Sequence, residues 1–193
     1  MSVTYPIKTK KKLEEMKNYY AMVKPNPRNY TLIVIGLNTA FRIGDLLRLQ
    51  WKHVYQEENQ SFRNHIYIME QKTDKMRVVP INSALQAALS SYRSQCRHTA
   101  PEDYLFASMR NKSKPISRYQ AFRIIKEAAV ASGMDEHISC HSLRKTFGYY
   151  AWQQGASPVL LMDLFNHSSF QITKRYLGIE QDERDALYLS INL

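Results

Sequence analysis

Residues 28–40 read RNYTLIVIGLNTA, a nearly continuous apolar stretch in which Arg28 is the only charged residue. Asn26 and Pro27 come directly before it, a capping side chain followed by a proline at the first helical position. A helix that is apolar on all sides has to be buried. The sequence therefore predicts a central buried helix, with Gly36 as its only weak point.

The period of the apolar residues changes twice along the rest of the chain. Near residues 10–23 the apolar residues recur at helical spacing. In KHVYQ, SFRNHIYIME and KMRVVPI every second residue is apolar, and this alternation predicts three short strands joined by polar turns. The helical period then returns, and the candidate helices are 82–97, 117–132, 141–154, 158–165 and 169–177. The expected fold class is mixed and mainly α with a small antiparallel β-sheet (α+β).

The composition indicates the class of partner and the compartment. A formal net charge of +10 favours a polyanion, either nucleic acid or an acidic membrane face, although some basic proteins have no such partner. The two cysteines, Cys96 and Cys140, form no CxxC motif or disulfide framework, which fits a reducing cytoplasm. No signal sequence or apolar run of transmembrane length is visible, so we expect a soluble, cytoplasmic protein without a membrane partner.

Four short pieces of sequence carry side chains that could do chemistry together. They are TAFRIGDLLRLQW with Arg42, QKTDKMRVVPI with Lys72, HSLR with His141 and Arg144, and LFNHSSFQITKRYLGI with His167 and Tyr176. Each residue alone has an ordinary structural explanation, such as a surface arginine, a turn lysine or a half-buried tyrosine. The combination is what calls for a functional explanation.

As a set, these residue types suit phosphoryl transfer. Arginines bind phosphate oxygens in a bidentate way, lysine and histidine exchange protons, and a tyrosine hydroxyl can attack phosphorus. The sequence has no carboxylate or His/Cys cluster for a metal, no glycine-rich phosphate loop and no Ser/His/Asp order. The chemistry expected is therefore phosphoryl transfer without metal or cofactor, with a nucleophile from the protein.

These four pieces, in this order, resemble the catalytic domain of tyrosine recombinases, the phage integrase family. The resemblance spans about residues 25–180, and HSLRKTFG followed by LLMDLFNHSSFQITKRYLGI carries most of its specificity. It implies the DNA breaking-rejoining enzyme fold and a site-specific DNA recombinase that forms a 3′-phosphotyrosyl intermediate. It also implies double-stranded DNA as the partner and a homo-oligomer, a tetramer, on that DNA.

The resemblance implies how the phosphate would be held. Arg42 and Arg144 would grip the nonbridging oxygens of the scissile phosphate, and His167 would donate a hydrogen bond to one of them. Asp45 matches the acidic residue that follows the first arginine in the family, and it would support the site without touching the substrate.

The remaining roles concern the nucleophile and its protons. Tyr176 would attack phosphorus, and His141 would act in proton transfer on its hydroxyl. Lys72, at the tip of the predicted hairpin, would protonate the leaving 5′-oxygen, although Lys75 in the same turn could serve instead.

Further basic residues are candidates for binding the DNA backbone on either side of the site. The helix at 117–132 could present such a surface, and a solvated charged face explains it equally well. Together, the candidates are Lys75, Arg77, Arg118, Arg123, Lys145, Lys174 and Arg175.

The chain departs from the family pattern at several points. Asn166 stands where the family usually has glycine before its last histidine, and asparagine tolerates the left-handed conformation. Ala40 and Phe41 replace the usual glycine-leucine pair before the first arginine. Gly148 shares a helical face with His141, Arg144 and Lys145, where it would leave room for substrate or simply pack against another helix.

We expect three regions, a basic N-terminal segment at 1–24, the catalytic domain at 25–180 and a tail at 181–193. The tail could pack onto a neighbouring protomer or onto its own core. The short N-terminal segment leaves two explanations open, an isolated catalytic domain or a naturally short recombinase. A type IB topoisomerase and a non-catalytic DNA-binding relative are the alternative functions.

Overall fold

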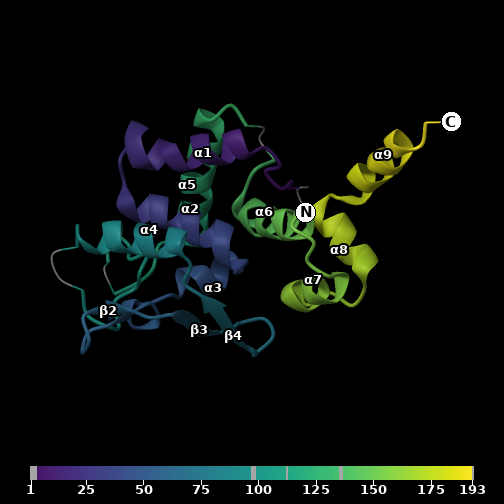
Figure 1. The fold of residues 1–193 in the computed structure, drawn as a ribbon. Coiled ribbons are helices and arrows are strands. Elements are labelled where there is room, and N and C mark those ends of the chain that lie inside the picture. Colours follow the sequence, from purple (N-terminus) through teal and green to yellow (C-terminus); the bar gives the residue numbers. More distant parts are fainter. Residues whose placement is uncertain (1–3, 97–98, 112, 135–136, 193) are drawn as a thin grey trace.

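The structure, a computed structural model, describes residues 4–96, 99–111, 113–134 and 137–192. The helices of the amino-terminal half are α1 (Lys10–Asn18), α2 (Pro27–Thr39), α3 (Ile43–Leu47) and α4 (Ser83–Arg93), with a π-helical turn at Tyr19–Val23 and a 3₁₀ turn at Trp51–His53. The later helices are α5 (Arg118–Ala131), α6 (Cys140–Gln153), α7 (Pro158–Phe165), α8 (Phe170–Leu177) and α9 (Glu180–Ser190). The expected fold class, mainly helical with short antiparallel strands, is confirmed (Figure 1).

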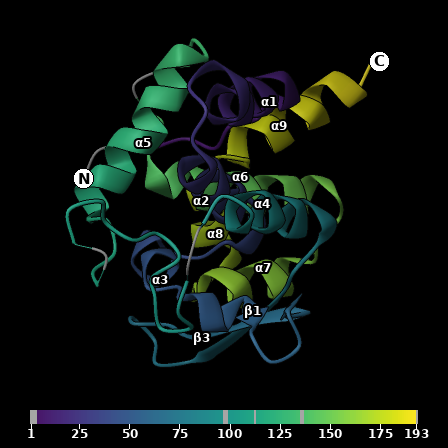
Figure 2. The same cartoon turned by 90° about the vertical axis from the view of Figure 1, so that its left-hand side faces the viewer.

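Helix α2 is the central buried helix that the sequence predicts. The Asn26 side chain caps it by accepting a hydrogen bond from the backbone N–H of Asn29, at 3.0 Å. Helices α4 and α6 pack against it, and α1 crosses on the other side of the bundle from the strands (Figures 1 and 2). A Cβ on Gly36 would lie 2.6 Å from Cδ1 of Leu143 on α6, so this glycine lets the two helices approach closely.

The strands form two small sheets where the sequence indicated one. β1 (Tyr55–Gln56) pairs with β2 (Ser61–Phe62), and β3 (His65–Met69) pairs with β4 (Met76–Pro80), both antiparallel. The segment 61–70, expected as one strand, is interrupted at Arg63 and Asn64. There the backbone N–H of Arg63 turns back to Val54, and the Asn64 carbonyl accepts from Ile81.

Helices α6, α7 and α8 surround a second, smaller apolar cluster that contains Leu161, Phe165 and Leu177. A Cβ on Gly148 of α6 would lie 2.5 Å from both Phe165 and Leu177, so this glycine serves helix packing. The close approach places α8, and with it Tyr176, directly against α6.

Residues 4–8, which we call the amino-terminal strap, bind α6 and the end of α8 at once. The Thr4 carbonyl accepts a hydrogen bond from Nζ of Lys145 at 2.6 Å, and the Ile7 N–H donates to the Thr146 hydroxyl at 2.7 Å. Lys8 donates to the Gly178 carbonyl at 3.0 Å and pairs with the carboxylate of Asp182 at 2.6 Å.

Helix α9 extends away from the rest of the chain (Figure 1). It has no buried residue, and Leu187, Tyr188, Leu189 and Ile191 near its end are all exposed. None of the helices in the described ranges is both long and apolar enough to cross a membrane.

Candidate active site

The two arginines predicted to grip a phosphate come together in space. Arg42 lies just before α3, and Arg144 lies on α6, where it is 3% exposed. Nη1 of Arg144 donates to the Ala40 carbonyl, and its Nη2 lies 3.4 Å from the Leu164 carbonyl. Burial lowers the pKa of Arg144 to about 10, and the charge of Arg42 adds to this effect. Residues 102 positions apart in the sequence therefore form one cationic site.

Tyr176 on α8 is directed into this cationic site. Burial raises the pKa of its phenol, while the charges of Arg144 and Arg42 oppose that rise. The ammonium of Lys145 lies 4.9 Å from the centre of the Tyr176 ring. The pKa stays above its ordinary value, so the phenol is neutral at pH 7, and the neighbouring cations would stabilise its oxygen as the proton leaves.

Both predicted histidines belong to the same site. The pKa of His141 is lowered by burial and by the charges of Arg144, Lys145 and Arg42, and that of His167 is lowered by burial, Arg144 and Arg42. His167 stands edge to face against the Tyr176 ring, 5.1 Å between ring centres. Both imidazoles are therefore biased toward the neutral form, which can accept or share a proton near pH 7.

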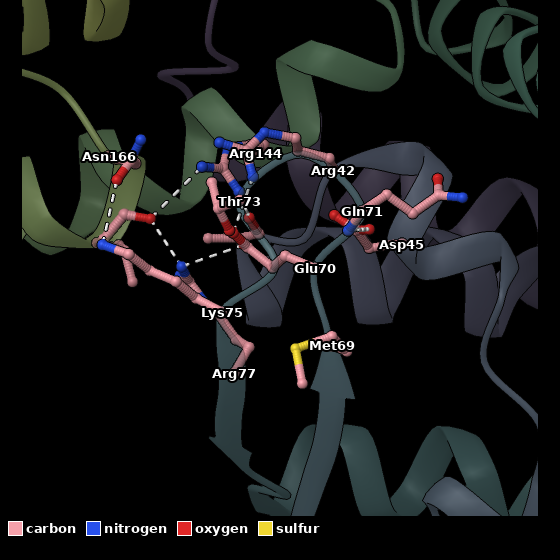
Figure 3. Close-up of polar contacts among 12 residues, drawn as sticks. Arg42, Asp45, Met69, Glu70, Gln71, Thr73, Lys75, Arg77, Arg144 and Asn166 are labelled. Atoms are coloured by element: carbon pink, nitrogen blue, oxygen red, sulfur yellow. Dashed lines mark hydrogen bonds and ion pairs between the residues drawn. The ribbon is translucent and has the colours of Figure 1, made fainter.

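The turn between β3 and β4 lies next to Arg42 and Arg144 and so forms another part of the site (Figure 3). Asp45, which is 1% exposed, accepts a hydrogen bond from the backbone N–H of Gln71 at 2.9 Å and so anchors the start of this turn. Lys72 is exposed at the tip and has no hydrogen-bond partner among the residues that the structure describes. Nζ of Lys75 lies 3.5 Å from Oδ1 of Asn166, the residue before His167.

The predicted DNA-binding residues divide into an exposed and an inward-facing group. Lys75, Arg118, Arg123 and Arg175 are exposed, and Arg118 lies beside Gly44 and Gln71, on the flank of the site. The other group is engaged within the chain: Arg77 with Glu70 and the Leu164 carbonyl, Lys145 with Thr4, and Lys174 with Glu183.

Asn166 takes the left-handed backbone conformation that the sequence predicts. It ends α7 with φ 56° and ψ 51°, in the left-handed region, so asparagine fills the place of the usual glycine. The turn delivers His167 to the site, where Nδ1 lies 3.1 Å from the Thr173 hydroxyl.

One residue of the site was missed in the sequence, the buried carboxylate of Glu70. It is 3% exposed and accepts hydrogen bonds from Arg42 and Thr73 at 2.9 and 2.8 Å. The signal was present, because Ile66, Ile68 and Glu70 alternate, and a strand places such residues on one face. A charged residue that continues an inward-facing row requires a buried partner.

Comparison with known proteins gives the family. The family model described as the phage integrase family matches residues 9–183. The chain belongs to the phage integrase family. The probable integrase/recombinase YoeC of Bacillus subtilis (strain 168) is 40% identical over 188 residues, 97% of each chain. The function of the chain is thus that of an integrase or recombinase of the tyrosine type.

Solved structures of recombinases share the fold. The crystal structure of the XerA recombinase is similar with a TM-score of 0.75 and 20% identity, over 97% of this chain and 64% of that one. The XerH site-specific recombinase bound to palindromic difH substrate gives a TM-score of 0.71 and 18% identity, over 97% and 53%. The chain therefore spans half to two thirds of the length of these two structures.

Proposed function

We propose that this chain cuts and rejoins double-stranded DNA at specific sites through a covalent 3′-phosphotyrosyl intermediate. The observation that carries the proposal is the convergence of Arg42, Arg144, His167 and Tyr176, with the phenol close enough to both guanidinium groups for their charges to act on its pKa. The XerH structure is a post-cleavage complex with a palindromic difH substrate, and the lambda integrase, a structure of similar fold, is bound to DNA, which supports DNA as the substrate class.

Strand cleavage would proceed as an exchange of one phosphoester for another. The Tyr176 oxygen attacks the scissile phosphorus, its proton passes to His141, and the bond from phosphorus to the 5′-oxygen breaks. Lys72 gives a proton to that departing oxygen, with Lys75 as the alternative donor. Arg42 and Arg144 stabilise the negative charge of the five-coordinate phosphorane, and His167 donates to one of its oxygens.

Rejoining would be the reverse attack by a 5′-hydroxyl from another strand. Because the phosphotyrosyl ester retains the energy of the broken phosphodiester, the exchange needs no nucleoside triphosphate. The guanidinium groups supply the positive charge that the phosphorane requires, so the proposed mechanism assigns no step to a metal ion or cofactor.

Recombination of two sites requires more than one protomer, and we propose a homo-oligomer on DNA, a tetramer when two sites are paired. Exposed apolar residues at the end of α9 and just beyond it support this proposal, since Leu187, Leu189 and Ile191 are each more than half exposed. The free thiols of Cys96 and Cys140 are compatible with a reducing, cytoplasmic location.

The proposal is tested with a nicked suicide DNA substrate that traps the covalent adduct. Wild type is expected to form an adduct that mass spectrometry locates on the peptide containing Tyr176, in EDTA as well as in Mg²⁺. Tyr176→Phe should bind DNA and form no adduct, whereas Tyr30→Phe, a partly buried control on α2, should behave as wild type.

The alternative functions predict different results in the same assay. A wild-type chain that binds DNA and never forms an adduct would be a non-catalytic relative. A chain that forms the adduct and relaxes a supercoiled plasmid without exchanging strands between two sites would be a topoisomerase. The proposal requires the adduct together with strand exchange in trans.

A further inference from the structure

Glu70 lies at the end of β3, where the backbone enters the turn that carries Lys72. Its carboxylate accepts from Nη1 of Arg42 at 2.9 Å, from the hydroxyl of Thr73 at 2.8 Å and from Nη1 of Arg77 at 3.4 Å (Figure 3). The side chain is 4% exposed. One buried anion thus joins an arginine of the site, the turn and a second arginine.

The surroundings of Glu70 are crowded with like charges. Burial is the largest cause that lowers the pKa of Arg144, and the charges of Arg42 and Arg77 lower it further. Burial is also the largest cause that lowers the pKa of Arg77, and the charge of Arg42 adds to it. Burial alone would raise the pKa of Glu70, yet the Thr73 hydrogen bond and the charges of Arg42 and Arg77 hold it below the ordinary value. The carboxylate is therefore ionised at neutral pH and offsets the repulsion among three guanidinium groups.

The carboxylate occupies only one edge of Arg42. Nε and Nη2 of Arg42 have no hydrogen-bond partner in the part of the chain that the structure describes, and its side chain is 21% exposed. A phosphate arriving from solvent can use those nitrogens while Glu70 keeps Nη1. Glu70 therefore acts as a fixed support behind the guanidinium, and it does not occupy the edge that a substrate would bind.

From this arrangement we infer that Glu70 is a positioning residue for strand cleavage, one that orients Arg42 toward the scissile phosphate and couples it to the turn carrying Lys72. The inference rests on the proposed function, since it assigns Arg42 to the phosphate. A support of this kind affects the transition state more than DNA binding, because most of the binding energy comes from other phosphate contacts.

The main test is Glu70→Gln, which keeps the shape of the side chain and removes its charge. In single-turnover cleavage of the suicide substrate at saturating enzyme, the rate constant is expected to fall about 10- to 100-fold. The dissociation constant for the same DNA should stay near the wild-type value. Glu58→Gln, an exposed glutamate in the turn between β1 and β2, is the matched control and should cleave as wild type.

A double-mutant cycle separates positioning from a purely structural effect. Arg42→Lys keeps the charge and removes the forked donor, so Glu70 has no guanidinium to orient. Adding Glu70→Gln to Arg42→Lys should then change the cleavage rate far less than it does in the wild type. Equal effects in both backgrounds, or a rate loss that follows the unfolded fraction in urea, would overturn the inference.

Thr73→Val tests the same role of Glu70 without changing Glu70 itself, and it serves if Glu70→Gln folds poorly. It removes one donor to the carboxylate from a partly exposed turn, and a smaller rate loss with unchanged DNA affinity is expected. Unchanged cleavage by both folded variants would overturn the role of Glu70 while the wild-type adduct still supports the recombinase. Absence of any wild-type adduct would overturn the proposed function itself.

Discussion

The carbonyl oxygen of Ala40 accepts a hydrogen bond from Nη1 of Arg144, so the residue that ends α2 holds the guanidinium that α6 carries. Ala40 is fully buried and left-handed, with φ 54°, and the chain turns there toward Arg42. The spacing of the two arginines is therefore fixed by backbone at the junction of two helices. Changes that move α2 against α6 should alter both stability and cleavage.

Gly36→Ala tests this junction. The added methyl group would lie 2.6 Å from Cδ1 of Leu143, and the overpacking, about 1–3 kcal/mol, should exceed the gain of about 1 kcal/mol in helix propensity. Urea unfolding should show a net loss of stability together with slower adduct formation. Combining Gly36→Ala with Leu143→Ala should remove most of the clash, and additive losses in the double variant would contradict the close approach.

The pH dependence of cleavage should reflect His141. Its pKa lies below the ordinary 6.5. The imidazole therefore stays neutral, and able to accept the phenol proton, until the pH falls below this lowered pKa. Single-turnover cleavage should be flat near pH 7 and decline only at more acidic pH. His141→Gln should cleave slowly and lose that acid decline. An acid decline that persists unchanged in the variant would assign the titration to another group.

The left-handed backbone at Asn166 predicts that glycine stabilises the protein more than alanine there, the opposite of the order expected inside a helix. Because it is exposed and left-handed, Asn166→Gly should be more stable than Asn166→Ala by about 1 kcal/mol. At Ser90, an exposed position inside α4, the order should be reversed, with alanine about 1 kcal/mol more stable than glycine. Thermal or urea unfolding of the four variants measures both differences, and the same order at both positions would contradict the left-handed turn.

Salt dependence separates the exposed arginines from other surface charges. The logarithm of the DNA association constant falls linearly with the logarithm of the salt concentration, and removing one cation that binds a phosphate should reduce this slope by about 1. Arg118→Ala and Arg123→Ala should therefore both make the slope shallower. Lys17→Ala is the comparison, since α1 lies at the opposite end of the molecule from the β3–β4 hairpin in both views (Figures 1 and 2). Equal slopes for all three variants would remove α5 from the DNA-binding surface.

Local signals in the sequence were sufficient for most helix boundaries. Asn26–Pro27 and Ser157–Pro158 predicted the starts of α2 and α7, and both capping side chains accept a backbone hydrogen bond there, at 3.0 and 3.2 Å. These starts depend on neighbouring residues alone, which is why the sequence reveals them.

Features that depend on distant partners were less accessible. The division of the strands into two sheets follows from how Arg63 and Asn64 bond to Val54 and Ile81, and no local pattern predicts those pairings. Lys145 was expected on a DNA-binding surface, but its ammonium binds the Thr4 carbonyl, a partner 141 residues away. Its role with DNA remains a prediction.

The amino-terminal strap has a mechanical consequence. It contacts α6 through Lys145 and Thr146, and it contacts the end of α8 through Gly178, two residues beyond Tyr176. A displacement of residues 4–8 would therefore act on the helix that carries Tyr176 through the exposed hydrogen bond from Lys8 to the Gly178 carbonyl. The position of the attacking oxygen therefore depends on how these five residues are held.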